Sequence, residues 1–206
     1  MKALLATKEQ MTQMFDEQGT AHPVTVLRVE PIVVTQIKTL ERDGYSAVQV
    51  GTALSKEKHV NKAQRGHQKG LSALYRTTRE FSAQGGPAEG WGVGDAIDIS
   101  IFAPGDKVSV SGVSKGKGFQ GVVKRHGFHG GPRTHGQKHS EREAGSIGAA
   151  GVQRVFKGVR MAGRMGGERV SVRNLTVLRV DVEKGELFIR GAVPGRRGTL
   201  IEVVQK

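Results

Sequence analysis

Residues 22–38 read HPVTVLRVEPIVVTQIK, and this stretch decides the fold class of the chain. β-branched and polar residues alternate through it on both sides of Pro31. A period of two places successive side chains on opposite faces of a strand, and proline interrupts the hydrogen-bond ladder of a sheet. The stretch therefore predicts two short β-strands with a break between them.

The same alternation predicts further strands outward from this segment. Residues 45–51 follow the turn pair Asp43-Gly44, and a second turn signal stands at Lys184-Gly185. Short strands at close spacing with turn signals between them are typical of a small barrel or sandwich. The fold is therefore expected to be mainly β. The remaining predicted strands are residues 96–102, 107–113, 169–182, 186–190 and 199–204.

Helix signals are weak along the whole chain. Residues 56–74 are the best candidate, but Gly66 and Gly70 interrupt them. A glycine inside a helix costs about 1 kcal/mol relative to alanine. We therefore expect an irregular helical segment there, within an insertion at about residues 52–92.

The charge of the chain is concentrated in its middle. The chain carries 32 Lys and Arg against 19 Asp and Glu, a formal net charge of +13. Residues 113–169 hold 12 Lys and Arg against 3 Asp and Glu, a net charge of +9, with 14 of the 30 glycines. The hydrophobic share of 36% is below the roughly 45–50% of ordinary globular domains. A nearly balanced body and a basic, glycine-rich middle are therefore expected.

Composition also excludes several classes of protein. The absence of cysteine excludes disulfide scaffolds, thiol catalysis and cysteine-ligated zinc. The sequence contains no run of about 18 apolar residues, so no membrane span is expected. The acidic residues among the first twenty are unlike a signal peptide. We expect a cytoplasmic protein whose excess charge is neutralised by a polyanion. Nucleic acid is the first choice for that polyanion, and an anionic membrane surface is the second.

Residues 124–167 lack the pattern of a core segment. They contain few β-branched residues and show no sustained period, so they cannot bury enough apolar surface to offset the entropy of ordering. They are either a disordered basic loop or an extension that becomes ordered on a polyanion. We expect one domain over residues 1–206, with a body formed by residues 1–123 and 168–206 and an extension at residues 124–167.

Residues 116–123 match the pattern G-x-G-x-x-G-x-V of kinase and dinucleotide-binding loops. The other kinase motifs are missing, and basic residues follow the glycines where a dinucleotide site needs an apolar helix. One remaining interpretation is a hairpin turn of glycines. The favoured one is a phosphate site made of backbone amides and the cations Lys115, Lys117, Lys124 and Arg125.

Four histidines, His126, His129, His135 and His139, follow closely in the sequence. They could bind zinc, but all-histidine zinc sites are mostly catalytic, and no general base stands beside these. Contacts with RNA are favoured, because imidazole can bond phosphate and stack on bases. No metal, cofactor, small-molecule substrate or membrane partner is expected.

Residues 154–166 place a cation every three or four positions. One interpretation is a solvated helix face, although three glycines oppose a stable helix. The other is an extended arm, in which guanidinium groups meet phosphates and Phe156, Met161 and Met165 make apolar contacts.

Several blocks together resemble the universal large-subunit ribosomal protein of the L-three family in its bacterial form. The resemblance covers essentially the whole chain, and any one block alone would be unspecific. The blocks are residues 8–15, 23–26, 43–49, 102–125, 134–136, 145–148, 155–158, 161–163 and 191–195.

This resemblance implies a six-stranded barrel like the second domain of translation factors, with an irregular mixed insertion and a long basic extension. It implies a structural, non-catalytic constituent of the large ribosomal subunit. Such a protein binds the rRNA near its 3′ end early in assembly, contacts neighbouring ribosomal proteins and reaches toward the peptidyl transferase centre. A free nucleic-acid-binding regulator is the alternative. The expected rRNA-binding residues are Lys115, Lys117, Lys124, Arg125, His126, His129, Arg133, His135, Lys138, Arg142, Arg154, Phe156, Lys157, Arg160 and Arg164.

Overall fold

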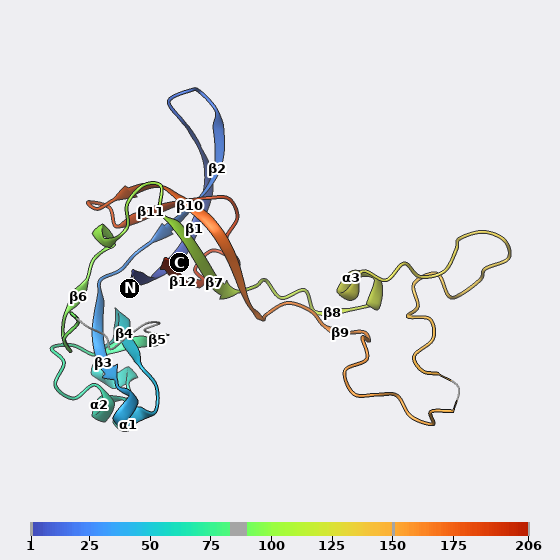
Figure 1. Ribbon diagram of the computed structural model, residues 1–206, viewed down its shortest axis with the longest axis horizontal. Helices are drawn as coiled ribbons and strands as arrows, with labels where there is room; N and C mark the ends of the chain where they lie inside the picture. Colours follow the sequence, from blue (N-terminus) through green and yellow to red (C-terminus); the bar gives the residue numbers. More distant parts are fainter. Residues whose placement is uncertain (1, 83–89, 150, 206) are drawn as a thin grey trace. The chain divides into compact units, whose positions relative to one another are not determined.

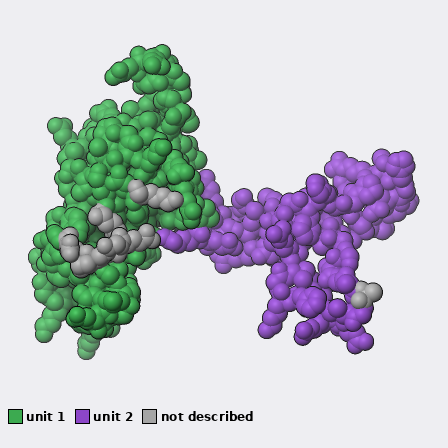
Figure 2. Space-filling model, viewed as in Figure 1, with its two compact units in different colours: residues 1–112, 170–206 green, residues 113–169 purple. Residues whose placement is uncertain are grey.

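The computed structural model describes residues 2–82, 90–149 and 151–205. The chain divides into two compact units (Figure 2): unit 1 consists of Met1–Gly112 and Val170–Lys206, and unit 2 consists of Val113–Arg169. Unit 2 is the segment over which the sequence carries a net charge of +9. The prediction of a mainly β fold is confirmed.

Six antiparallel strands close into a barrel in unit 1, in the order β1-β12-β7-β10-β11-β2 (Figure 1). The two chain ends pair with each other, since Ala3 on β1 lies opposite Val204 on β12. The strands are β1 (Ala3–Phe15), β2 (Ala21–Arg28), β7 (Lys107–Val113), β10 (Arg169–Asp181), β11 (Glu186–Arg190) and β12 (Leu200–Gln205).

A second sheet of unit 1 has the strand order β5-β4-β3-β6. Its strands are β3 (Ile32–Lys38), β4 (Ala47–Leu54), β5 (Tyr75–Ser82) and β6 (Ala96–Ile97). The short helical segments of unit 1 are α1 (Leu40–Asp43), η1 (Glu57–His59), α2 (Lys62–His67) and η2 (Ile99–Ile101).

One hydrophobic core joins the barrel to the second sheet. Leu4, Leu187 and Ile201 of the barrel and Ile32 and Val34 of β3 are fully buried in the same cluster. The first four residues of β1, Ala3 to Ala6, are all buried, so both faces of the strand are covered there. This double burial explains why the start of β1 reads as a continuous apolar run.

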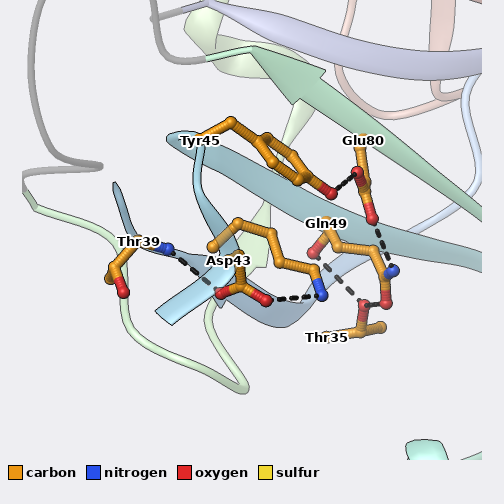
Figure 3. Close-up of polar contacts among 7 residues, drawn as sticks. Thr35, Thr39, Asp43, Tyr45, Gln49 and Glu80 are labelled. Carbon is orange, nitrogen blue, oxygen red and sulfur yellow. Dashed lines mark hydrogen bonds and ion pairs between the residues drawn. The ribbon is translucent and has the colours of Figure 1, made fainter. Parts of the chain in front are cut away.

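A polar network lies on the second sheet (Figure 3). Thr35 Oγ1 donates to Gln49 Oε1 at 2.8 Å, and Gln49 Nε2 donates to Glu80 Oε1 at 3.1 Å. Tyr45 Oη donates to the other oxygen of Glu80 at 2.8 Å. This hydrogen bond, followed by burial, raises the pKa of Tyr45 above its ordinary value. The network therefore ties β3, β4 and β5 together across the sheet.

The strands around Pro31 are confirmed, because β2 and β3 lie on either side of it. The prediction of one strand over residues 96–102 is wrong. β6 ends at Ile97, and Asp98 Oδ1 accepts a hydrogen bond from the amide of Ile99 at 2.7 Å. This cap begins the 3₁₀ turn η2, so the chain leaves the sheet.

The helical expectation over residues 56–74 is confirmed only in part. The segment contains η1 and the six-residue α2, which Asn61 caps by accepting a hydrogen bond from the amide of Gln64 at 2.8 Å. Strands β1 and β5 were not predicted from the sequence. Within the proposed insertion at about residues 52–92, residues 83–89 lie outside the described part. In the part that the structure describes, no helix is long and apolar enough to cross a membrane.

Candidate nucleic-acid interface

Unit 2 begins and ends in two antiparallel segments, residues 114–120 and 163–168, which we call the stalk. Within it, β8 (Phe119–Gln120) pairs with β9 (Gly163–Arg164). The rest of the ladder is made by the amide-to-carbonyl bonds Ser114 to Glu168 at 2.9 Å, Lys117 to Met165 at 2.9 Å, Met165 to Gly118 at 3.0 Å and Gly167 to Ser114 at 3.2 Å.

The stalk decides between the two interpretations of residues 116–121. These residues run along the ladder and make no hairpin turn, so the interpretation as a turn of glycines is wrong. The amide of Lys117 donates to Met165 and is therefore not available to a phosphate. The side chains of Lys115 and Lys117 are exposed. A phosphate at the stalk would thus meet ammonium groups and not the Lys117 amide.

The short helix α3 (Val122–His126) follows the stalk and ends at Gly127, whose φ of 73° is left-handed. Arg125 donates from Nη1 to the carbonyl oxygen of Met161 at 2.7 Å. His126 Nε2 lies 3.0 Å from the same oxygen, and because a carbonyl can only accept, this nitrogen is the donor. Both side chains are half-buried. They hold the returning chain beside α3.

Gly163 permits this arrangement. A Cβ atom at this position would lie 2.7 Å from Nη1 of Arg125, closer than real contacts allow. The guanidinium group therefore occupies the space that any side chain at residue 163 would need.

Residues 130–141 form a loop that closes on itself. The amide of Gly131 donates to the carbonyl oxygens of Ser140 and Glu141 at 3.2 and 3.1 Å. A Cβ atom at Gly130, whose φ is +73°, would collide with the Glu141 carbonyl. Arg133 forms an ion pair with the carboxylate of Glu141. The loop thus has a main-chain closure and one internal charge pair.

Residues 145–160 contain no helix or strand among those that the structure describes, and each described residue there is exposed. Large apolar side chains are exposed with them, including Ile147 at 45% and Phe156 at 53%. The guanidinium carbon of Arg154 lies 5.8 Å from the ring centroid of Phe156. In the described part of unit 2, the one buried apolar side chain is Val122. This segment therefore has no core of its own.

All the rRNA-binding residues expected from the sequence lie in unit 2. Arg125 and His126 are engaged with Met161, and Arg133 is paired with Glu141. Among the described residues, no ion pair joins the other expected Lys and Arg residues to a carboxylate. The exposed members of the set are Lys115, Lys117, Lys124, His129, Arg133, His135, Lys138, Arg142, Arg154, Phe156, Lys157, Arg160 and Arg164.

The four histidines of unit 2 are not brought together. Over the described residues, no three His, Cys, Asp or Glu side chains gather in a way that could hold a metal ion. His126 instead contacts the Phe128 ring, with centroids 5.9 Å apart. Sequence reasoning missed the stalk and the contacts to Met161, because their acceptors are main-chain carbonyls that carry no sequence signal.

Known proteins resemble this chain along nearly its whole length. The family model described as Ribosomal protein L3 matches residues 95–192. Two relatives named large ribosomal subunit protein uL3 are each 50% identical to the chain. The one from Acidothermus cellulolyticus aligns over 98% of this chain and 91% of its own length, and the one from a Roseiflexus species over 98% and 96%. A uL3 from Finegoldia magna is 48% identical over 98% and 97%.

These identities extend far beyond the basic middle segment and cover both units. They confirm the resemblance found in the sequence blocks. The chain therefore belongs to the ribosomal protein L3 family, a family of structural, non-enzymatic proteins.

Proposed function

We propose that this chain is a structural constituent of the large ribosomal subunit and that unit 2 is its main rRNA-binding element. One observation carries the proposal. Unit 2 holds 12 Lys and Arg against 3 Asp and Glu, and most of its cations are exposed and have no carboxylate partner among the described residues. Exposed cations without partners repel one another, and bound phosphates remove that repulsion.

The exposed apolar side chains of unit 2 fit the same partner. Phe156, with Arg154 above its ring, can stack on an unpaired base, as aromatic and guanidinium groups do in RNA recognition. In water, these exposed apolar side chains contribute no free energy of burial. Against RNA, they add contact area that ion pairing alone does not provide.

The stalk and the segment beyond it are proposed to have different roles. The stalk is hydrogen-bonded within the chain, so it presents Lys115, Lys117 and Arg164 from a formed ladder. Residues 128–160 lack a core and are proposed to gain their final order on the RNA, at an entropic cost that the phosphate contacts offset.

Family membership supports the finer parts of the proposal. These are a barrel like that of translation factors, an extension at residues 124–167 that threads through rRNA toward the peptidyl transferase centre, binding near the 3′ end early in assembly, and contacts with neighbouring ribosomal proteins. The proposed phosphate contacts are Lys115, Lys117, Lys124, Lys138, Arg142, Arg154, Lys157, Arg160 and Arg164, with Arg133 once its ion pair opens.

Sedimentation of cell lysates tests this function against the alternative of a free nucleic-acid-binding regulator. The tagged wild-type chain should travel with large subunits. A variant with Arg154→Glu, Lys157→Glu and Arg160→Glu should shift substantially into the free pool, because reversed charges repel phosphate. The matched control reverses Lys58, Lys62 and Lys69 of unit 1 to Glu, which makes the same change in net charge on exposed side chains.

The control should remain with the subunits. A wild-type chain found mainly in the free pool would contradict the proposed function and favour the regulator.

A further inference from the structure

The first hairpin of unit 1 carries a mainly apolar face that is exposed in the part of the chain that the structure describes. β1 and β2 continue past the buried part of the barrel as a two-stranded ribbon, in which Met11 lies opposite Thr25 and Phe15 lies opposite Ala21 (Figure 1). The residues of β1 from Gln10 to Gln13 are exposed. We call residues 11–23 the ribbon. A two-stranded ribbon alone is only marginally stable in water, so a second surface against it would stabilise it.

One face of the ribbon is mainly apolar. Because side chains alternate along a strand, Met11, Gln13 and Phe15 share a face with their cross-strand neighbours Thr25, Pro23 and Ala21. Met11 is 50% exposed and Phe15 is 64% exposed. A shallow hollow beside the ribbon is lined by residues of both its faces, namely Met11, Thr12, Gln13, Ala21, His22 and Pro23. The exposed side chains of Met11 and Phe15 can therefore contact an apolar side chain of a partner.

The tip of the ribbon has a defined shape and a negative charge. One carboxylate oxygen of Asp16 accepts hydrogen bonds from the amides of Gln18 at 3.0 Å and Thr20 at 2.8 Å. Its other oxygen lies 3.1 Å from Nε2 of His22. The Thr20 amide, with smaller help from His22, lowers the pKa of Asp16 against the opposing effect of burial. The neighbouring carboxylate of Glu17 is exposed.

The charge of this region is opposite to that of the whole chain. Residues 10–27 contain no Lys or Arg and two acidic residues, Asp16 and Glu17, in a chain of net charge +13. Such a surface repels phosphate groups, so RNA is disfavoured there. The ribbon is complementary to a cationic protein surface. Its mainly apolar face would provide contact area, and its acidic tip would provide the opposite charge.

We propose that the ribbon is a docking surface for a basic segment of another protein, which places an apolar side chain against Met11 and Phe15 and a Lys or Arg beside Glu17. This inference rests on the proposed function, since it takes the partner to be a neighbour in the large subunit. The partner binds through this face while unit 2 binds RNA, so the acidic and basic parts of the chain serve different partners.

Photo-cross-linking in purified large subunits tests the proposal. The full chain carries Phe15→p-benzoylphenylalanine, a change at an exposed side chain outside the core. Irradiation should give an RNase-resistant adduct with a peptide of another protein that has Lys or Arg near the attachment point. Adding Glu17→Lys should lower the yield about threefold or more, because it reverses the charge at the contact. Adding Glu183→Lys, at an exposed turn of the same unit, should leave the yield unchanged.

Other results would overturn the proposal. These are an RNase-sensitive adduct with rRNA, an adduct with a second copy of this chain, no adduct, or a yield that Glu17→Lys does not change. Each of them leaves the chain within the large subunit and so leaves the proposed function standing. A cross-linkable chain that is absent from large subunits would overturn both.

Discussion

The guanidinium group of Arg125 donates a hydrogen bond to the main-chain oxygen of Met161 at 2.7 Å and so joins two residues that are 36 positions apart in the chain. The contact lies where α3 meets the returning half of unit 2, next to the stalk. Residues 128–160 thus leave and return at one closed point. Arg125 therefore positions the segment that carries most of the exposed cations, whether or not it also contacts a phosphate.

Replacement of Arg125 should loosen the stalk without unfolding unit 1. In Arg125→Ala, the lost hydrogen bond weakens the closure by about 1 kcal/mol, so the amides of Lys117 and Met165 should exchange hydrogen roughly fivefold faster. Hydrogen exchange read by mass spectrometry measures this. Arg154→Ala, which removes an exposed arginine outside the stalk, serves as the control. Equal exchange rates in wild type and Arg125→Ala would refute the positioning role.

A methyl group at residue 163 should have a similar effect by a different route. Gly163→Ala places Cβ 2.7 Å from the position of Nη1 of Arg125, so the flexible end of the arginine side chain must shift. Exchange at the stalk should rise by no more than in Arg125→Ala, and the double variant should rise no further than Arg125→Ala alone, because both changes act on the same contact. Gly148→Ala is the matched control, since nothing lies within 4 Å of its added Cβ. Full additivity of the two changes would show that they act separately.

Acid should destabilise the barrel by protonating the carboxylate of Asp106, which bonds to Lys2 near the start of the chain. Its carboxylate accepts hydrogen bonds from the amide of Ala103 at 3.0 Å and from Lys2 Nζ at 3.1 Å. The Ala103 bond first, and then the Lys2 bond, lower the pKa of Asp106 below 3.8. A lowered folded-state pKa favours folding above the unfolded value of about 3.8, and this contribution disappears as pH falls through the folded value.

Asp106→Asn should therefore reduce the unfolding temperature near neutral pH. The difference from wild type should shrink as the pH drops below about 3.8, the ordinary value from which the Asp106 pKa is lowered. Thermal unfolding followed by circular dichroism at a series of pH values measures it. A difference that stays constant down to the lowest pH would exclude a titrating role for Asp106.

The strands that the sequence predicted are those whose own residues carry the alternation. β3 and β7 are rich in valine, and the sequence placed β7 with the bounds that the structure has. β1 reads ALLATKEQMTQMF, with only two β-branched residues, and its strand conformation depends on pairing with β12 and β2. Because this pairing joins the first strand to the last, local sequence patterns could not indicate it.

The candidate site shows the same limit. Its composition predicted the kind of partner, since a run of cations and glycines without a hydrophobic period indicates a polyanion-binding segment. The sequence could not show which cations are held by contacts within the chain and which are exposed. Arg125 and Arg164 look equivalent in the sequence, yet Arg125 is held by Met161, whereas the Arg164 side chain is exposed on β9. Only the path of the returning chain separates them.

The salt dependence of rRNA binding tests the central claim most directly. The two proteins to compare are the full chain and a chain in which a short Gly-Ser linker replaces residues 128–160, whose ends the Met161 contacts hold together. Six Lys and Arg lie in the removed segment, and each phosphate contact contributes roughly −0.7 to −0.9 to the log–log slope of affinity against salt. With the far-ultraviolet circular dichroism of unit 1 preserved, the slope should become shallower by roughly four to five. An unchanged slope would contradict the claim that unit 2 carries the rRNA binding.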